Sequence, residues 1–406
     1  MSVKKAFGGN GPDKARNDND LGRESFTLDV PIQGGGSKSV YGYGYLYALL
    51  EDRDIYLRRI SATSGAALGS AAIASIINAH DDYDTGRHAA MRQLVKLKDT
   101  TARNGDIMIQ FLRNCAELRG IDWASDDPNI PPLMIDELEK YVQWRNTFRD
   151  SFNTANDLRQ LCMMNYIMFP PMAICEMWTQ ILTAPVSNTL NYDPVANIID
   201  NSIPDIATIN NARHIQLSVN ATNTNDPDNM YNVNFGPGRI TRDVLRASAN
   251  LRELGNTVTI DGQPYIDGGY QANPAFDPVF NAEDRTTTLM IATNEMPAAI
   301  TPGKQSAFKK DMALYDAMHE EAINEFIHHA QNGEDCHLVV MPPDLGMDHT
   351  AILNPEQWWL DKLFNLGYEQ AKADLPDLKA NFGRRSTYHW HMPGHNQGAP
   401  TLKMAN

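Results

Sequence analysis

The fold is decided by residues 26–79, which read FTLDVPIQGGGSKSVYGYGYLYALLEDRDIYLRRISATSGAALGSAAIASIINA. Residues 26–32 alternate well enough to predict a strand, and a glycine turn then leads into a helix predicted over residues 38–51. A second strand, at 55–60, runs through a short turn into a small-residue helix at 66–79. This order of strand, loop, helix, strand, turn and helix predicts a parallel α/β sheet.

The rest of the chain extends this pattern into one α/β domain that we expect to span residues 23–375. Helical periodicity dominates from about 80 to 210 and predicts a helical insertion. Strand patterns then return at 214–219, 257–260, 288–292 and 337–341. Helices are predicted at 306–330 and after Asn354, which resembles a helix N-cap. Residues 1–22 and 376–406 are polar and are expected to form tails. The predicted architecture is a three-layer sandwich with a mainly parallel central sheet and the helical insertion.

Composition narrows the classes of partner. The 406 residues are 42% hydrophobic, enough for a large core, and carry a formal net charge of -15, which disfavours nucleic acid. The 4 cysteines are far apart and form no C-x-x-C pair, so neither a disulfide framework nor a thiolate metal site is indicated. We find no apolar run that would act as a signal peptide or cross a bilayer. A cytoplasmic protein is expected. Export by a route that needs no such signal is the alternative.

The first motif is the glycine-rich segment between the first strand and the first helix. Gly34, Gly35 and Gly36 let backbone amides point at one spot, and the following helix N-terminus adds partial positive charge, so the loop could hold an oxyanion. A phosphate-binding P-loop would need glycine where Ser37 stands, and the dinucleotide fingerprint lacks its third glycine. A plain tight turn is the alternative.

The second motif surrounds Ser64, at the end of a strand and before an apolar helix. A serine on such a sharp turn exposes its hydroxyl, and the amide of the next residue, Gly65, is free to stabilise a tetrahedral intermediate. Taken alone, this segment favours a serine that only caps the helix. The third motif, Asp267-Gly268-Gly269, follows a short apolar run and would by itself be read as a turn.

Together the three motifs resemble the patatin-like phospholipase family, which has them in this order. The glycine loop resembles its oxyanion loop, residues 62–66 resemble its nucleophile elbow, and residues 267–269 resemble its Asp-Gly-Gly motif. Residues 45–51 and 246–249 resemble helices of the same family, so the resemblance spans roughly residues 26–280.

The resemblance implies a lipid acyl hydrolase with a catalytic dyad and no cofactor. Ser64 would attack the acyl carbonyl and Asp267 would take its proton, without a histidine between them. The oxyanion would be held by the glycine loop, Gly34 to Gly36, and by Gly65. An aspartate of ordinary pKa is a weak base, so the dyad needs a dry pocket. Two positions depart from the family pattern, because Ala62 and Ala66 stand where the elbow usually has glycine.

Weaker signals complete the predictions. Met163, Met168 and Met172 lie in a segment rich in methionine and aromatic residues, which fits either an acyl-chain pocket or an ordinary core helix pair. A Ser-Asp-His esterase of the α/β-hydrolase type is a rival, with a histidine from one of three positions: His337, His349 and His389. The other rival function is that of a non-catalytic lipid-binding or interaction protein. The expected partner is a lipid or a membrane-interface substrate; no metal site and no protein partner is indicated.

Overall fold

The structure is a computed structural model, and it describes residues 25–131, 133–134, 194–251, 257–293, 307–342, 345, 347, 349–383 and 388–391. Its strands are β1 (Phe26–Ile32), β2 (Ile55–Ala62), β3 (Gln216–Asn223), β4 (Tyr231–Phe235), β5 (Val258–Ile260), β6 (Gln263–Asp267), β7 (Thr287–Ala292), β8 (Cys336–Val340) and β9 (Tyr388–His391). Its helices are α1 (Ser39–Glu51), α2 (Ser64–Ile77), α3 (Tyr83–Leu118), α6 (Pro194–Ser202), α7 (Ile206–Asn211), α8 (Arg242–Ser248), α9 (Asp277–Phe280), α10 (Ala307–Gln331) and α11 (Gln357–Ala380), with short 3-10 turns η2 (Gly36–Lys38), η4 (Gly268–Tyr270) and η5 (His349–Leu353).

The strands form one mixed sheet in the order β5-β6-β3-β2-β1-β7-β8-β9, and β4 pairs with β3 away from this path. Every pairing from β3 across to β9 is parallel, whereas β4, β5 and β6 join by antiparallel pairings. Strand β1 lies between two parallel neighbours and is buried on both faces: Leu28, Val30 and Ile32 point to one face, and Asp29 and Pro31 are buried on the other. This architecture confirms the predicted α/β fold with a mainly parallel sheet.

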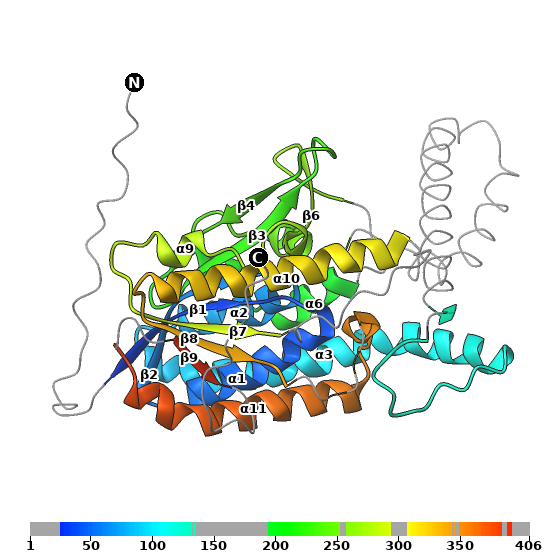
Figure 1. Ribbon diagram of the computed structural model, residues 1–406, viewed down its shortest axis with the longest axis horizontal. Coiled ribbons are helices and arrows are strands. Elements are labelled where there is room, and N and C mark those ends of the chain that lie inside the picture. The colour runs from blue at the N-terminus through cyan, green and yellow to red at the C-terminus, as the bar shows by residue number, and fades with distance from the viewer. Residues whose placement is uncertain are drawn as a thin grey trace, which may run out of the picture.

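Helices cover both faces of the sheet. Helices α1 and α11 lie on one side of the strands and α10 lies on the other (Figure 1). The contact between α1 and α11 is close because each helix presents a glycine: a Cβ on Gly44 would lie 1.9 Å from Phe364 O, and one on Gly367 would lie 1.9 Å from Tyr41 O. The C-terminal helix is therefore part of the core.

Several element boundaries differ from the predicted ones. Helix α2 begins at Ser64 itself, and α11 begins at Gln357 instead of next to Asn354. Residues 376–380 belong to α11 and residues 388–391 form β9, although we expected all of them in a polar tail. The helix continues through its proline because the leucines on either side, Leu375 and Leu378, are buried. Strand β9 is recognisable only from its pairing with β8, a long-range contact.

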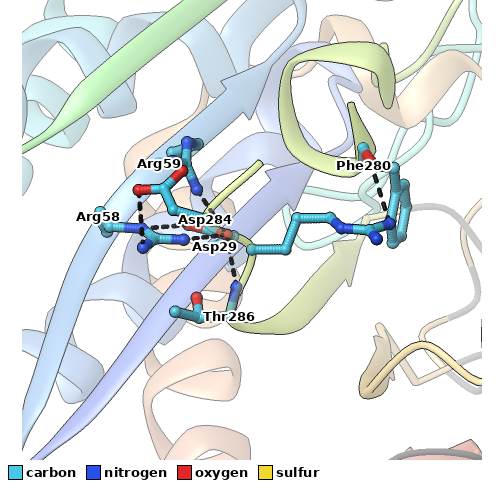
Figure 2. Close-up of polar contacts among 7 residues, drawn as sticks. Asp29, Arg58, Arg59, Phe280, Asp284 and Thr286 are labelled. Atoms are coloured by element: carbon cyan, nitrogen blue, oxygen red, sulfur yellow. Dashed lines mark hydrogen bonds and ion pairs between the residues drawn. The ribbon is translucent and has the colours of Figure 1, made fainter. Parts of the chain in front are cut away.

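A buried carboxylate on β1 is balanced by two neighbouring arginines of β2, and Figure 2 shows these side chains converging. Asp29 is fully buried and accepts hydrogen bonds from Arg58 at 3.0 and 3.2 Å and from Arg59 at 3.1 Å. The backbone N–H of Thr286 also donates to it, at 3.3 Å. Asp284 contacts the same two arginines, so the cluster joins β1 and β2 to the segment that precedes β7. Because every charge has a partner, the cluster is tolerated inside the sheet.

Replacing Asp29 by asparagine is expected to lower the free energy of unfolding by about 3 kcal/mol, because Arg59, with 8% of its side chain exposed, would lose a buried counter-charge. Urea-induced unfolding measures this loss. Asp284→Asn is the matched control: Asp284 contacts the same arginines but is 66% exposed, so it should cost about 1 kcal/mol or less. Equal losses in the two variants would contradict a role for buried charge.

Candidate active site

Strand register brings the three motifs to one edge of the sheet. Ile32, the last residue of β1, pairs with Ala62, the last residue of β2, so the segments that follow the two strands are neighbours. On the other side of β2, Ala62 pairs with Val219 of β3, and Ala221 of β3 pairs with Asp267. Ala221 lies two residues beyond Val219, as residue 64 lies two beyond Ala62. Asp267 is thus level with Ser64 at this edge.

Ser64 lies at a sharp junction between strand and helix. Thr63 has extended backbone and Ser64 has φ 56, in the left-handed region that non-glycine residues rarely adopt. Such a conformation costs roughly 1 kcal/mol or more and is typical of functional sites. The backbone N–H of Ser64 donates to the hydroxyl of Ser248 on α8, at 3.0 Å. We did not single out Ser248 from sequence; it lies in the segment 246–249 that carried part of the resemblance.

The alanines at the elbow do not prevent this geometry. Ala62 and Ala66 are both buried, and the left-handed conformation of Ser64 forms between them. The expected exposure of the hydroxyl is wrong for this structure, because only 3% of Ser64 is exposed. The residue is covered by close neighbours: a Cβ on Gly34 would lie 2.5 Å from the Cβ of Ser64. Ser64 is therefore shielded from bulk solvent, which a dyad with an aspartate base would require.

Asp267 ends β6 and is fully buried. Its Oδ1 accepts a hydrogen bond from the N–H of Gly269 at 2.8 Å, and its own N–H donates to the carbonyl of Asn250 at 3.0 Å. Oδ2 has no close hydrogen-bond donor in the described part of the chain. Burial raises the pKa of Asp267 to about 7, while the Ser64 side chain and the N–H of Gly269 act in the opposite direction. With no donor beside it among the described residues, Oδ2 is able to accept a proton.

An apolar cluster includes residues close to Asp267 in sequence. Ile266 and Tyr270 pack in it with Leu251, which follows α8, and with Ile352 and Leu353 from η5. Burial destabilises the charged form of the Asp267 carboxyl group, which is the physical cause of its raised pKa.

The glycine loop wraps around the elbow at two points. A Cβ on Gly34 would meet Ser64, and a Cβ on Gly65 would lie 2.8 Å from the carbonyl oxygen of Gly36. Gly36 has φ 55, and a Cβ there would lie 2.3 Å from the carbonyl oxygen of Ile352. These positions need glycine because backbone approaches backbone. Within the described ranges, the amides of Gly35, Gly36 and Gly65 donate to no protein acceptor.

Gly34 differs from the other glycines of the loop. Its N–H already donates to the side-chain oxygen of Asn273 at 2.7 Å. We therefore correct the expectation that Gly34 supplies an oxyanion-binding amide; its contribution is the close approach to Ser64. Asn273 lies four residues beyond the third motif, and sequence reasoning gave it no role.

The remaining predicted residues lie elsewhere. Met163, Met168 and Met172 are outside the described residues. His337 is buried on β8, 3.5 Å from Asp335, whereas His349 is in η5 and His389 is in β9. Among the contacts of the described residues, none joins a histidine to Ser64 or Asp267. In the same part of the chain no three side chains of histidine, cysteine, aspartate or glutamate converge as metal ligands would.

Comparison with protein families gives one match. The model of the patatin-like phospholipase family matches residues 32–280, which hold all three motifs. The chain belongs to this family. Helices α10 and α11 and strand β8 lie beyond the matched residues, and β8 continues the same sheet through β7.

Solved structures of bacterial effectors are distantly similar. VipD from Legionella pneumophila has a TM-score of 0.36 and 14% identity, covering 86% of this chain and 67% of VipD. ExoU of the Pseudomonas aeruginosa type III secretion system, in complex with SpcU, has a TM-score of 0.31 and 15% identity, with 89% of this chain covered. A second ExoU structure has a TM-score of 0.27 and 14% identity, with 87% of this chain covered. The chain spans 54% of each ExoU chain. Comparison with curated proteins gave no match. No described helix is long and apolar enough to cross a membrane.

Proposed function

We propose that this patatin-like protein hydrolyses carboxylic esters of phospholipids or related acyl lipids through an acyl-enzyme on Ser64. The observation that carries the proposal is the pairing of a serine in strained left-handed backbone with a fully buried aspartate whose pKa is about 7. A carboxylate in this environment is a far better base than an ordinary aspartate and is still substantially ionised at neutral pH.

In the first half-reaction the Ser64 hydroxyl oxygen attacks the acyl carbonyl carbon, and its proton moves to Oδ2 of Asp267. The negative charge on the carbonyl oxygen is met by the amides of Gly35, Gly36 and Gly65, which have no other acceptor in the described residues. Gly65 also lies in the first turn of α2, where the helix dipole favours negative charge. The tetrahedral intermediate then collapses, and Asp267 returns its proton to the leaving alcohol oxygen.

In the second half-reaction water attacks the acyl-enzyme. Asp267 accepts a proton from the water, and the same amides hold the second oxyanion. Collapse of this intermediate breaks the bond to Ser64, whose oxygen recovers the proton from Asp267, and the carboxylic acid is released. One water is consumed for each ester, and no cofactor takes part in the proposed steps.

The acid limb of the pH profile tests this proposal. Asp267 must be ionised to accept the proton, so kcat/KM should fall tenfold per pH unit below an apparent pKa of about 7 and level off above it. The measurement is fatty-acid release from phosphatidylcholine vesicles, with soluble nitrophenyl esters in parallel, between pH 5 and pH 9. A limb near the ordinary aspartate pKa of about 4 would exclude this base. Absence of hydrolysis and of fluorophosphonate labelling would favour the non-catalytic lipid-binding alternative.

A further inference from the structure

A buried histidine on α10 contacts the glycine loop. His319 is only 2% exposed, and its Nε2 lies 2.5 Å from the side-chain nitrogen of Asn273 and 2.9 Å from the carbonyl oxygen of Gly34. Its own carbonyl accepts a hydrogen bond from the Gln33 side chain at 3.0 Å. Residue 319 lies beyond the residues that match the family model.

The direction of these hydrogen bonds follows from the backbone. The N–H of Gly34 can only donate, so the atom of Asn273 that it contacts at 2.7 Å is the amide oxygen. The amide NH2 of Asn273 must then face His319. Nε2 of His319 is within hydrogen-bond distance of both this NH2 and the Gly34 carbonyl: it accepts from Asn273 in one tautomer and donates to the carbonyl in the other. The carbonyl of Gly34 receives its hydrogen bond from the hydroxyl of Thr293, at 2.8 Å.

The backbone of Gly34 is consequently held at both of its polar groups, one in each of the two peptide units that flank its Cα. Asn273 holds the N–H, Thr293 holds the carbonyl, and His319 packs against that carbonyl while it orients Asn273. Gly34 is immediately followed by Gly35 and Gly36, two of the residues whose amides we assign to the oxyanion. A shift of the Gly34 peptide would displace both of these amides, and misplacement by about 1 Å can cost on the order of 100-fold in rate.

We infer that His319 is a positioning residue of the oxyanion loop, acting through Asn273 on the peptide of Gly34. The inference rests on the proposed function, because it assigns His319 a part in the same reaction. His319 touches neither Ser64 nor Asp267 in the contacts recorded for the described residues, so it differs from the histidine of a triad.

The test compares His319→Leu, which removes the acceptor, with His319→Gln, whose amide oxygen can occupy the place of Nε2. For hydrolysis of a soluble ester, we expect His319→Leu to lower kcat by about 10- to 100-fold with KM within about twofold. His319→Gln should restore kcat to within about fivefold of wild type. His328→Leu is the matched control, since His328 is exposed on the same helix and should leave kcat unchanged.

A second readout follows the loop without relying on turnover. Hydrogen exchange of the peptide that contains residues 33–36 should be faster in His319→Leu than in wild type, and close to wild type in His319→Gln and His328→Leu. An unchanged kcat in His319→Leu would overturn the inference, as would equal loss in the Leu and Gln variants with unchanged exchange.

The two proposals fail in different ways. A wild-type protein that hydrolyses no ester, or a Ser64→Ala variant as active as wild type, would remove the proposed function. Faster exchange of residues 33–36 in His319→Leu would then still show that His319 holds the loop, and unchanged exchange would remove the positioning role as well.

Discussion

Replacing Asp267 by asparagine is expected to lower kcat for ester hydrolysis by about 10⁴-fold while the protein remains folded. The amide cannot accept the proton of Ser64, and in the proposed dyad no second group takes over this transfer. The shape of the side chain is retained, so substrate binding should change little and the loss should appear in kcat. Steady-state kinetics with a soluble ester and circular dichroism of the same samples measure both properties.

The same variant should also change how the free energy of unfolding depends on pH. The pKa of Asp267 is raised to about 7 by burial, so the folded protein keeps this carboxyl protonated at pH values where the unfolded chain has already lost the proton. Wild-type stability should therefore decline as pH rises from about 4 to about 7. The full cost of ionising Asp267 is present above pH 7 and is about 4 kcal/mol. Asp267→Asn avoids this cost.

Its free energy of unfolding, relative to wild type, should consequently increase between pH 4 and pH 8. A relative loss of stability with rising pH would show that the ionised carboxylate is stabilised in the folded protein. That result would contradict its assignment as a base with a raised pKa.

Histidine variants separate the dyad from a triad. His337→Ala, His349→Ala and His389→Ala should each keep kcat within a few-fold of wild type, because none of these residues has a recorded contact with Ser64 or Asp267. A folded variant of this set with a loss on the scale of Asp267→Asn would favour the triad.

Ser64→Ala is expected to reduce hydrolysis by about 10⁴-fold or more and to abolish labelling by a fluorophosphonate, since the attacking oxygen is removed. The matched control is Ser70→Ala in the same helix: Ser70 is also buried, and its hydroxyl has no partner among the described residues. Activity of Ser70→Ala should equal that of wild type. Residual hydrolysis of Ser64→Ala at the wild-type rate would show that another residue is the nucleophile.

A glycine at the same position reports on the strain of the elbow. Ser64 has φ 56, a conformation that glycine adopts freely and alanine does not. Ser64→Gly should therefore be more stable than Ser64→Ala by about 1 kcal/mol in denaturant unfolding, with both variants inactive. Equal stability would indicate that the left-handed conformation carries no strain.

Sequence alone determined the local features of this protein. The alternation of strand and helix patterns over residues 26–79 identified the α/β fold, because side-chain periodicity is a property of each segment. The order of the glycine loop, Ser64 and Asp267 identified the family and both members of the proposed dyad. Glycine at residues 34–36 was recognisable for a related reason: few other residues allow backbone to approach backbone so closely.

The tertiary structure decided what depends on residues far apart in the chain. Pairing of Ala62 with Val219, and of Ala221 with Asp267, places Ser64 and Asp267 at one level of the sheet. Capture of the Gly34 N–H by Asn273 joins residues 239 positions apart, and the contact of His319 with Gly34 joins residues 285 apart. Neither pair leaves a periodicity or a short motif, because a hydrogen bond between distant residues exists only once the sheet and α10 have brought them together. Burial of Asp267, and with it the raised pKa, likewise arises only on folding, which removes the carboxyl group from water.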